Sequence, residues 1–132
     1  MNKKRSKLRK PTPAELEILG ILWRSGPATV RAVHTELERT EPVTYTTVLK
    51  LMQIMTEKGL LERDESERAH IYRPTSEQAD TQGQIVRDVV DRVFGGSAAQ
   101  LVMRALSEKR ASPRDIAEIR QILDEAEKGG KR

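Results

Sequence analysis

The most regular pattern of apolar and polar positions lies in residues 42–59, PVTYTTVLKLMQIMTEKG. Apolar residues recur there at spacings of three and four, which places their side chains on one side of a helix. These residues are Val48, Leu51, Met52 and Met55. The opposite side carries Thr46, Thr47, Lys50 and Gln53, with no carboxylate before Glu57. We therefore predict an amphipathic helix over residues 44–59 whose polar side is free of acidic groups for most of its length.

Both ends of this helix are marked in the sequence. Thr44 is the expected N-cap, since a threonine hydroxyl accepts a hydrogen bond from a free backbone amide of the first turn. Lys58 and Gly59 are expected to end the helix, because a cation suits its negative end and glycine readily adopts the left-handed conformation that follows. Between Leu60 and Pro74 the alternation changes to a period of two on either side of a charged turn, which predicts a β hairpin.

Two more helices are predicted upstream. Thr12-Pro13-Ala14-Glu15 has the pattern of a capping box with proline in the first turn, and Gly26-Pro27 should end the helix that it opens. The apolar positions of this helix are Ile18, Leu19, Leu22 and Trp23. Thr29 is expected to cap a second helix that ends at Glu41-Pro42 and turns Val30, Val33 and Leu37 inward. Three helices followed by a two-stranded hairpin are the element order of a winged helix-turn-helix.

The C-terminal residues 76–132 predict three further amphipathic helices. Ser76, Ser97 and Ser112 are the expected N-caps, and glycine pairs at 95–96 and 129–130 should end two of the helices. Because three such helices bury little by themselves, we expect them to pair with a second copy of the chain. The predicted interface residues are Val89, Val93, Leu101, Leu106, Ile116, Ile119 and Leu123. The alternative is that these helices pack back onto the preceding domain.

Composition limits the remaining possibilities. Aromatic residues make up only 3% of the 132 residues, so the core must be aliphatic. The chain has no cysteine, which excludes disulfides and thiolate metal sites, and we expect no metal and no cofactor. No apolar run reaches the roughly 18 residues of a membrane span, and the basic N-terminus leads into Pro11-Thr12-Pro13 instead of an apolar stretch. We therefore expect no membrane association and a cytoplasmic location.

The net charge of +4 is unevenly distributed. Residues 1–74 contain 14 Lys and Arg against 10 Asp and Glu, whereas residues 75–132 contain 10 of each. Six of the positive residues lie within the first ten positions, where there is no acid: Lys3, Lys4, Arg5, Lys7, Arg9 and Lys10. A basic arm of this kind can lie along DNA phosphates and add salt-dependent affinity, or it can simply keep the terminus soluble.

The predicted fold class is mainly α with a small β hairpin. We expect a flexible basic arm at residues 1–11, a winged-helix DNA-binding domain at 12–75 and a helical dimerisation domain at 76–132. In such a domain the third helix enters the major groove of double-stranded DNA, where Lys50 can donate to guanine and Gln53 to adenine. The full set of predicted DNA-binding residues is Thr44, Tyr45, Thr46, Thr47, Lys50, Gln53, Arg68 of the wing, and Arg9 and Lys10 of the arm.

Several segments together resemble a known family. They are residues 14–19, AELEIL; Leu22-Trp23; Thr47-Val48; Leu51; Lys58-Gly59-Leu60; Tyr72; and residues 112–123, SPRDIAEIRQIL. In their order and spacing they resemble the penicillinase-repressor family of bacterial transcription regulators, the BlaI/MecI/CopY type. The resemblance implies a homodimeric winged-helix repressor that binds a dyad operator.

The sequence also departs from that family. Inducible members are cleaved at an Asn-Phe pair through a membrane sensor-protease pathway, and this chain has Arg104-Ala105 at the corresponding position. Such a pathway is a candidate partner, but induction by that cut is not implied. Copper-responsive members carry a cysteine cluster, which this chain lacks. Ile54 stands where the family often has arginine, so the operator sequence is expected to differ.

The sequence can be compared with two other classes of function, an enzyme and a protein-binding adaptor. His34 and His70 are the only imidazoles, and no nucleophile motif or glycine-rich phosphate loop accompanies them, so we do not expect an enzyme. His34 is expected to be an ordinary residue at the boundary of the core. The stronger alternative is an adaptor that uses the winged fold to bind another protein. In that case the polar side of the helix 44–59 is merely solvated and reads no DNA sequence.

Overall fold

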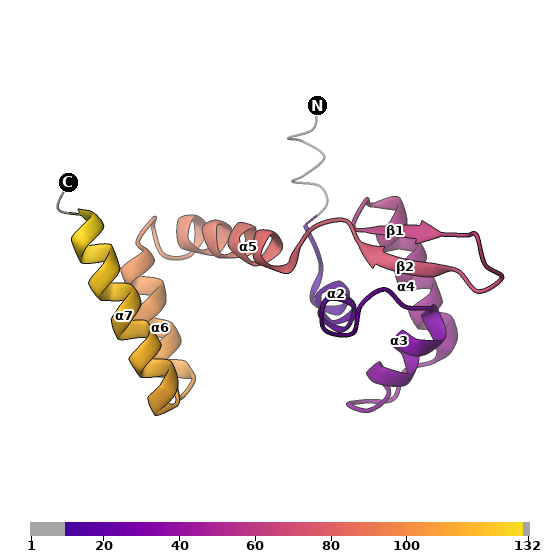
Figure 1. Ribbon diagram of the computed structural model, residues 1–132, viewed down its shortest axis with the longest axis horizontal. Helices are drawn as coiled ribbons and strands as arrows, with labels where there is room; N and C mark the ends of the chain where they lie inside the picture. Colours follow the sequence, from indigo (N-terminus) through magenta and orange to yellow (C-terminus); the bar gives the residue numbers. More distant parts are fainter. Residues whose placement is uncertain (1–9, 131–132) are drawn as a thin grey trace. The chain divides into compact units, whose positions relative to one another are not determined.

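The computed structural model describes residues 10–130. The chain divides into two compact units, with the division between Gly83 and Gln84. The first unit contains α2 (Pro13–Ser25), α3 (Val30–Leu37), α4 (Tyr45–Glu57), β1 (Leu61–Asp64) and β2 (Ile71–Pro74) (Figure 1). Helices with one antiparallel hairpin confirm the predicted fold class of a mainly α protein.

All three helices of the first unit begin at the predicted threonine caps. The side chains of Thr12, Thr29 and Thr44 accept hydrogen bonds from the backbone amides of Glu15, Ala32 and Thr47 at 3.2, 3.1 and 3.1 Å. The predicted glycines follow α2 and α4, where Gly26 and Gly59 have φ angles of +90° and +86°. Side chains with a Cβ atom are strained in that region, so glycine is required at both turns.

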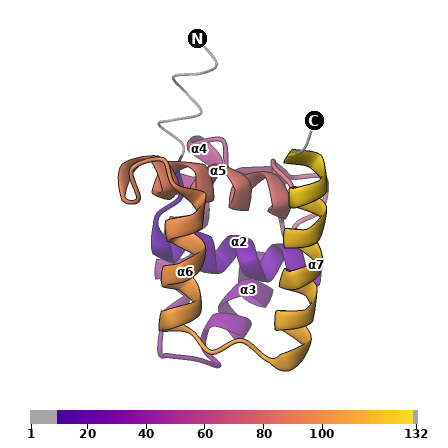
Figure 2. The same ribbon diagram turned by 90° about the vertical axis from the view of Figure 1, so that its left-hand side faces the viewer.

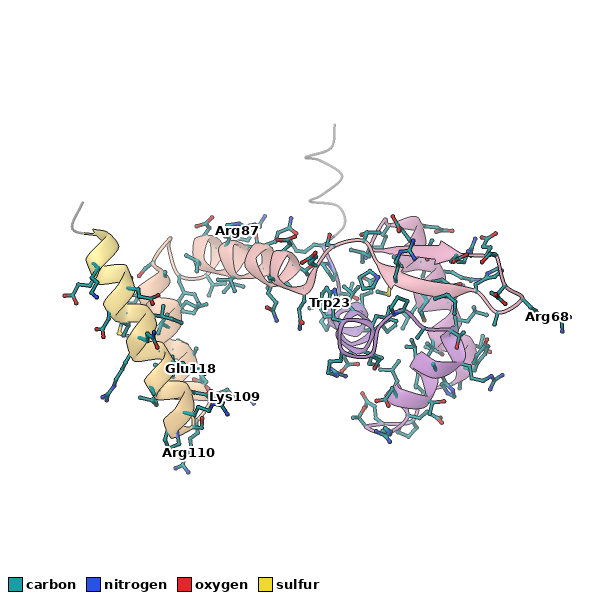
Figure 3. All side chains as sticks on the ribbon, in the orientation of Figure 1. Trp23, Arg68, Arg87, Lys109, Arg110 and Glu118 are labelled. Carbon is teal, nitrogen blue, oxygen red and sulfur yellow. The ribbon has the colours of Figure 1, made fainter. Side chains whose placement is uncertain are left out.

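The core of the first unit is aliphatic, as its composition predicts. The buried side chains come from all five elements: Ile18, Leu19, Ile21, Leu22, Val30, Val33, Val48, Met52, Met55, Leu61 and Tyr72. Trp23 is half-buried at its edge, and its Nε1 donates to the carbonyl oxygen of Ser76 at 3.0 Å (Figure 3). Leu51 is also half-buried. The other three residues of the predicted apolar side of α4, Val48, Met52 and Met55, are fully buried.

The hairpin is attached to the helices by backbone hydrogen bonds. In register, Leu61 pairs with Pro74 and Asp64 with Ile71. Ala28, in the turn between α2 and α3, exchanges two hydrogen bonds with Tyr72, at 3.0 and 2.8 Å. The Ala28–Tyr72 bridge is therefore a second pairing, one residue long, that joins the wing to the helix-turn-helix.

The second unit consists of helices without a core of their own. It holds most of α5 (Gln78–Arg92), together with α6 (Ala98–Glu108) and α7 (Pro113–Gly130), and a short connection joins the last two (Figure 2). Between residues 84 and 129 no side chain is buried. Apolar side chains exposed there are Val86, Val93, Val102, Met103, Leu106, Ile122 and Leu123.

Helix boundaries in this part agree with the sequence at some ends and not at others. Ser97 and Ser112 cap α6 and α7 by accepting from the amides of Gln100 and Asp115. Gly95 and Gly96 follow α5 with positive φ angles, as predicted. The cap predicted at Ser76 is wrong, because α5 begins only at Gln78. The predicted end of α7 before Gly129-Gly130 is also wrong, since the helix runs through that pair.

Candidate nucleic-acid interface

The outward side of α4 is a continuous polar surface. Its members, which we call the polar face, are Thr46, Thr47, Lys50 and Gln53, and all four are exposed. On the opposite side Val48, Met52 and Met55 are fully buried, which fixes the rotation of the helix about its axis. Ile54, at the flank of the polar face, is 37% exposed. Hydroxyl, amide and ammonium groups thus project outward on successive turns with no carboxylate among them.

Thr44 and Thr47 are linked at the start of this helix. Besides accepting from the Thr47 amide, Thr44 donates its hydroxyl to the Thr47 hydroxyl at 2.9 Å. The hydroxyls of Thr44 and Thr47 are therefore joined within the cap. Thr44 therefore has a structural role as the cap of α4, and Thr47 is its hydrogen-bond partner.

Tyr45, the first residue of α4, packs against two side chains of α3. The guanidinium carbon of Arg31 lies 5.0 Å from the centre of the Tyr45 ring, a cation–π arrangement. The ring of His34 meets it edge-on, with centroids 6.0 Å apart at 84°. His34 Nε2 lies 2.7 Å from the carbonyl oxygen of Val43, so it donates to the turn that precedes α4. Arg31 and His34 therefore position the start of the polar helix.

The role of these two α3 residues could not be found from the sequence pattern. Arg31 and His34 are three positions apart on a helix, so they project from one side of it. That spacing shows that they share a side and does not show what they contact. His34 is more than the ordinary boundary residue that the sequence predicts, because it joins α3 to the backbone just before α4.

Two of the three carboxylates in the turn of the wing, residues 64–68, are held by neighbouring groups. Glu65 pairs with Arg63 at 2.6 Å, and Asp64 accepts from the Ser66 amide at 2.9 Å. Hydrogen bonds from the backbone and side chain of Ser66 lower the pKa of Asp64 below its ordinary value of 3.8. Arg68 is exposed and lies in the loop that joins the strands, where its side chain extends outward (Figure 3). Arg63 thus compensates the charge of Glu65, whereas the bonds from Ser66 keep Asp64 ionised.

An ion pair connects the far end of α4 to the first helix. Lys58 Nζ donates to both carboxylate oxygens of Glu15, at 2.7 and 2.9 Å. Glu15 is only 3% exposed and also accepts from the Thr12 amide at 2.9 Å. The pattern that placed Lys58 at a helix end did not reveal this partner, which is 43 residues away.

Several predicted groups remain to be placed. Lys10 is exposed, whereas Arg9 and the rest of the basic arm lie outside the described residues. Within residues 10–130 no cluster of His, Asp or Glu is arranged to hold a metal ion. In the same range, no helix combines the length and hydropathy needed to cross a bilayer.

The residues predicted to mediate dimerisation are all accessible. Val93, Leu106 and Leu123 are exposed, and Val89, Leu101, Ile116 and Ile119 are half-buried. Val93 and Leu123 keep 67% and 58% of their surface exposed. Val93 lies directly after α5 and the others lie on α5, α6 and α7, in a unit that buries none of them.

Comparison with known proteins gives one family. A sequence model of the penicillinase repressor family matches residues 11–125. The penicillinase repressor of Bacillus licheniformis is 25% identical over 112 residues, covering 85% of this chain and 88% of that protein. The transcriptional regulator BlaI of Mycobacterium tuberculosis is 27% identical over 125 residues, covering 94% and 90%. The methicillin resistance regulatory protein MecI of Staphylococcus aureus is 22% identical over 111 residues, covering 84% and 90%.

A solved structure supports the fold. A MarR family protein from Bacillus stearothermophilus aligns with a TM-score of 0.50 and 16% sequence identity, covering 98% of this chain and 82% of that chain. At this identity the likeness bears on the fold alone, and it agrees with a winged helix built from α2, α3, α4 and the β1–β2 hairpin.

Proposed function

The chain belongs to the penicillinase repressor family, and we propose that it represses transcription as a homodimer bound to a dyad operator in double-stranded DNA. The family consists of transcriptional repressors, so the chain is a DNA-binding regulator and not an enzyme. Beyond DNA binding itself, we propose a homodimer, a dyad operator and a set of residues that contact the DNA. Each rests on a separate feature of the two units.

The observation that carries the proposal is the polar face of α4. Its rotation is fixed by the buried Val48 and Met52, so Thr46, Lys50 and Gln53 must project together. In the major groove, Lys50 would donate to guanine, Gln53 would pair with adenine, and the threonines would contact thymine methyl groups or phosphates. Thr44 supports this surface as the cap. Tyr45 and Arg68, with Arg9 and Lys10 of the arm, would contact the backbone.

Dimerisation is supported by the uncovered apolar side chains of α5, α6 and α7. A second copy would bury Val89, Val93, Leu101, Leu106, Ile116, Ile119 and Leu123, which the described unit leaves accessible. A homodimer presents two copies of α4 to two half-sites, and symmetric half-sites form a dyad operator. Each half-site then adds its own discrimination, so contacts that are weak singly give a specific complex.

The experiment is a binding titration on the promoter regions adjacent to the gene. Purified protein is titrated against labelled fragments at several salt concentrations, and the bound fragment is footprinted. We expect one protected region with two symmetric halves, and a steep fall in affinity as salt rises. A footprint without two symmetric halves would contradict the dyad operator and the binding of a dimer to it. Equal affinity for every fragment would contradict sequence-specific repression.

An adaptor that binds another protein is the alternative, and the same titration separates the two. An adaptor would give no salt-dependent complex that distinguishes one fragment from another. The family match to transcriptional repressors favours the DNA-binding function over the adaptor. Acting on DNA, the protein would work in the bacterial cytoplasm.

A sensor-protease pathway is a candidate partner, but we propose that release from DNA does not occur by a cut at Arg104-Ala105. The position Arg104-Ala105 lies inside α6, and Arg104 pairs with Glu108 of the same helix at 3.5 Å. A cut there would require α6 to open. We expect the chain to remain intact at this bond when the regulated gene is induced, which mass spectrometry of the protein from induced cells would test. Fragments that end at Arg104 would contradict this expectation and show that the chain is cleaved at this bond during induction.

A further inference from the structure

We propose that a recess between α3, α4 and the wing binds one backbone phosphate of the operator in each half-site. The polar lining of this wing recess is Thr29, Arg31, Tyr45, Arg68 and His70. The inference rests on the DNA binding proposed above and extends it from the polar face of α4 to a second site. There, α3 and the wing would hold the sugar-phosphate chain while α4 meets the bases.

The charge of the lining distinguishes the wing recess from two other hollows of the first unit. It has a volume of about 340 Å³, and none of its lining residues is acidic. The hollow between α2 and α3 is lined by Glu17 and Glu36, and the one beside the α3–α4 turn by Glu17 and Glu41. Of the three, only the wing recess offers an anion arginines without a facing carboxylate.

The arginines of the wing recess also differ from those around it. Arg39, Arg63 and Arg73 each form an ion pair, with Glu36, Glu65 and Glu62. Among the described residues neither Arg31 nor Arg68 forms one, and both are exposed. An unpaired guanidinium keeps its donors for a ligand, and its planar fork matches two phosphate oxygens.

Arg31 is positioned before any ligand arrives. Its guanidinium carbon lies 5.0 Å from the centre of the Tyr45 ring, and the His34 ring packs edge-on against the same tyrosine. His34 in turn donates to the carbonyl of Val43 at 2.7 Å. A side chain restrained in this way loses less freedom when it binds an anion.

The wing recess adjoins the polar face. Tyr45 and Leu49 of α4 line it, and each immediately precedes a member of that face, Thr46 and Lys50 respectively. A phosphate held there is therefore next to the bases that α4 would contact. Phosphate contacts of this kind set the register of a protein on the duplex without reading its sequence.

The first test measures the salt dependence of operator binding for the full chain and for Arg31→Gln. The plot of log affinity against log salt should lose about 0.9 of its slope for each phosphate contact removed. At physiological salt we expect several-fold weaker binding to operator and nonspecific DNA alike. Arg24→Gln is the matched control, because it removes the same charge from an exposed arginine of α2 outside the wing recess. Its slope should stay closer to that of the wild type.

The second test locates the phosphate. Operator duplexes carry a neutral methylphosphonate at one position at a time, and each is bound by the wild type and by Arg31→Gln. One position in each half-site should weaken the wild type but leave Arg31→Gln unchanged, because the variant no longer uses that phosphate. The operator affinity of Arg31→Lys should lie between those of the wild type and Arg31→Gln. Lysine keeps the positive charge but lacks the planar guanidinium that can bond two phosphate oxygens. Circular dichroism melting of each variant shows whether its fold is intact.

The outcomes separate this inference from the proposed function. If the wild type binds its operator and Arg31→Gln behaves as Arg24→Gln in both tests, the wing recess is not a phosphate site and the repressor proposal stands. If the wild type forms no specific complex with DNA, both the proposed repressor function and the phosphate site are refuted. If methylphosphonates weaken Arg31→Gln at every position where they weaken the wild type, Arg31 contacts no phosphate.

Discussion

Glu15 is the charged side chain buried most deeply in the described structure, and its surroundings explain how it is tolerated. Two bonds from Lys58 and one from the Thr12 amide satisfy the carboxylate. The same residue closes the capping box of α2, so one side chain both starts a helix and anchors the end of α4. Removing its cation would leave a buried charge without a partner, which costs far more than losing a surface ion pair.

Lys58→Met should therefore lower the free energy of unfolding of the first unit by about 2 kcal/mol, less than for a fully buried pair because Lys58 is 26% exposed. Urea denaturation followed by circular dichroism measures the change. The double variant Glu15→Gln, Lys58→Met should recover part of the loss, since it removes the unpaired charge as well. Equal stability of Lys58→Met and the wild type would show that the Glu15–Lys58 ion pair contributes no more than an exposed one.

Lys50 is the only cation of the polar face, so its removal tests that face most directly. We expect Lys50→Ala to weaken operator binding by about 1–3 kcal/mol if it contacts a base, or to lower the salt slope by about 1 if it contacts a phosphate. Fluorescence anisotropy at three salt concentrations separates the two cases. Lys128→Ala, an exposed lysine in α7, is the control. Unchanged affinity and slope would exclude Lys50 from the interface.

Among the elements, the wing has a charged turn, two of whose carboxylates are bonded to neighbouring groups. Glu65 pairs with Arg63, which compensates its charge, whereas Asp64 stays ionised and accepts hydrogen bonds from Ser66. The pKa of Asp64 is lowered by these hydrogen bonds, foremost that from the Ser66 backbone. Its contribution to the turn is therefore present above the ordinary pKa and is lost as pH falls through the lowered value.

We accordingly expect the Asp64 carboxyl to titrate below 3.8, with the Ser66 amide resonance moving at the same midpoint. Nuclear magnetic resonance titration from neutral to acid pH would record both. Asp64→Asn should abolish the Ser66 shift, whereas Glu67→Gln should leave it in place. A midpoint at or above 3.8 would show that the turn does not hold Asp64 as described.

Elements set by local chemistry could be predicted from the sequence, and those set by distant contacts could not. The caps at Thr12, Thr29 and Thr44 follow from a hydroxyl and amides three residues away. Ser76 carries the same local signal, but its carbonyl is bonded by Trp23, 53 residues earlier, and the helix begins later. The polar face followed from helical periodicity. The wing recess did not, because it exists only once α3, α4 and the hairpin have packed together.

For the whole molecule, the main asymmetry is between a unit with a core and one without. Every fully buried apolar side chain in the described range belongs to the first unit. Burying a valine or leucine contributes about 1.5–3 kcal/mol, and the second unit gains little of this by itself. We infer that its helices reach their stable form against a second copy.

Val93→Asp should consequently convert a dimer into monomers. With about 2 kcal/mol lost in each copy, the dissociation constant should rise on the order of a thousandfold. Sedimentation velocity across a concentration series measures it. Arg114→Asp is the control, since that side chain is 89% exposed and an acid suits the first turn of α7. A wild type that stays monomeric at micromolar concentration would refute the dimer.

The hydrogen bond from Trp23 to Ser76 makes the tryptophan an intrinsic fluorescent probe of the segment that precedes α5. The chain contains a single tryptophan, and its indole N–H is bonded to the backbone just ahead of α5. Tryptophan fluorescence therefore arises from one place, where the chain leaves the winged helix for the helices beyond. Any event that loosens this segment, whether operator, inducer or heat, would hydrate the indole and move its emission to the red, so the connection can be followed without a label.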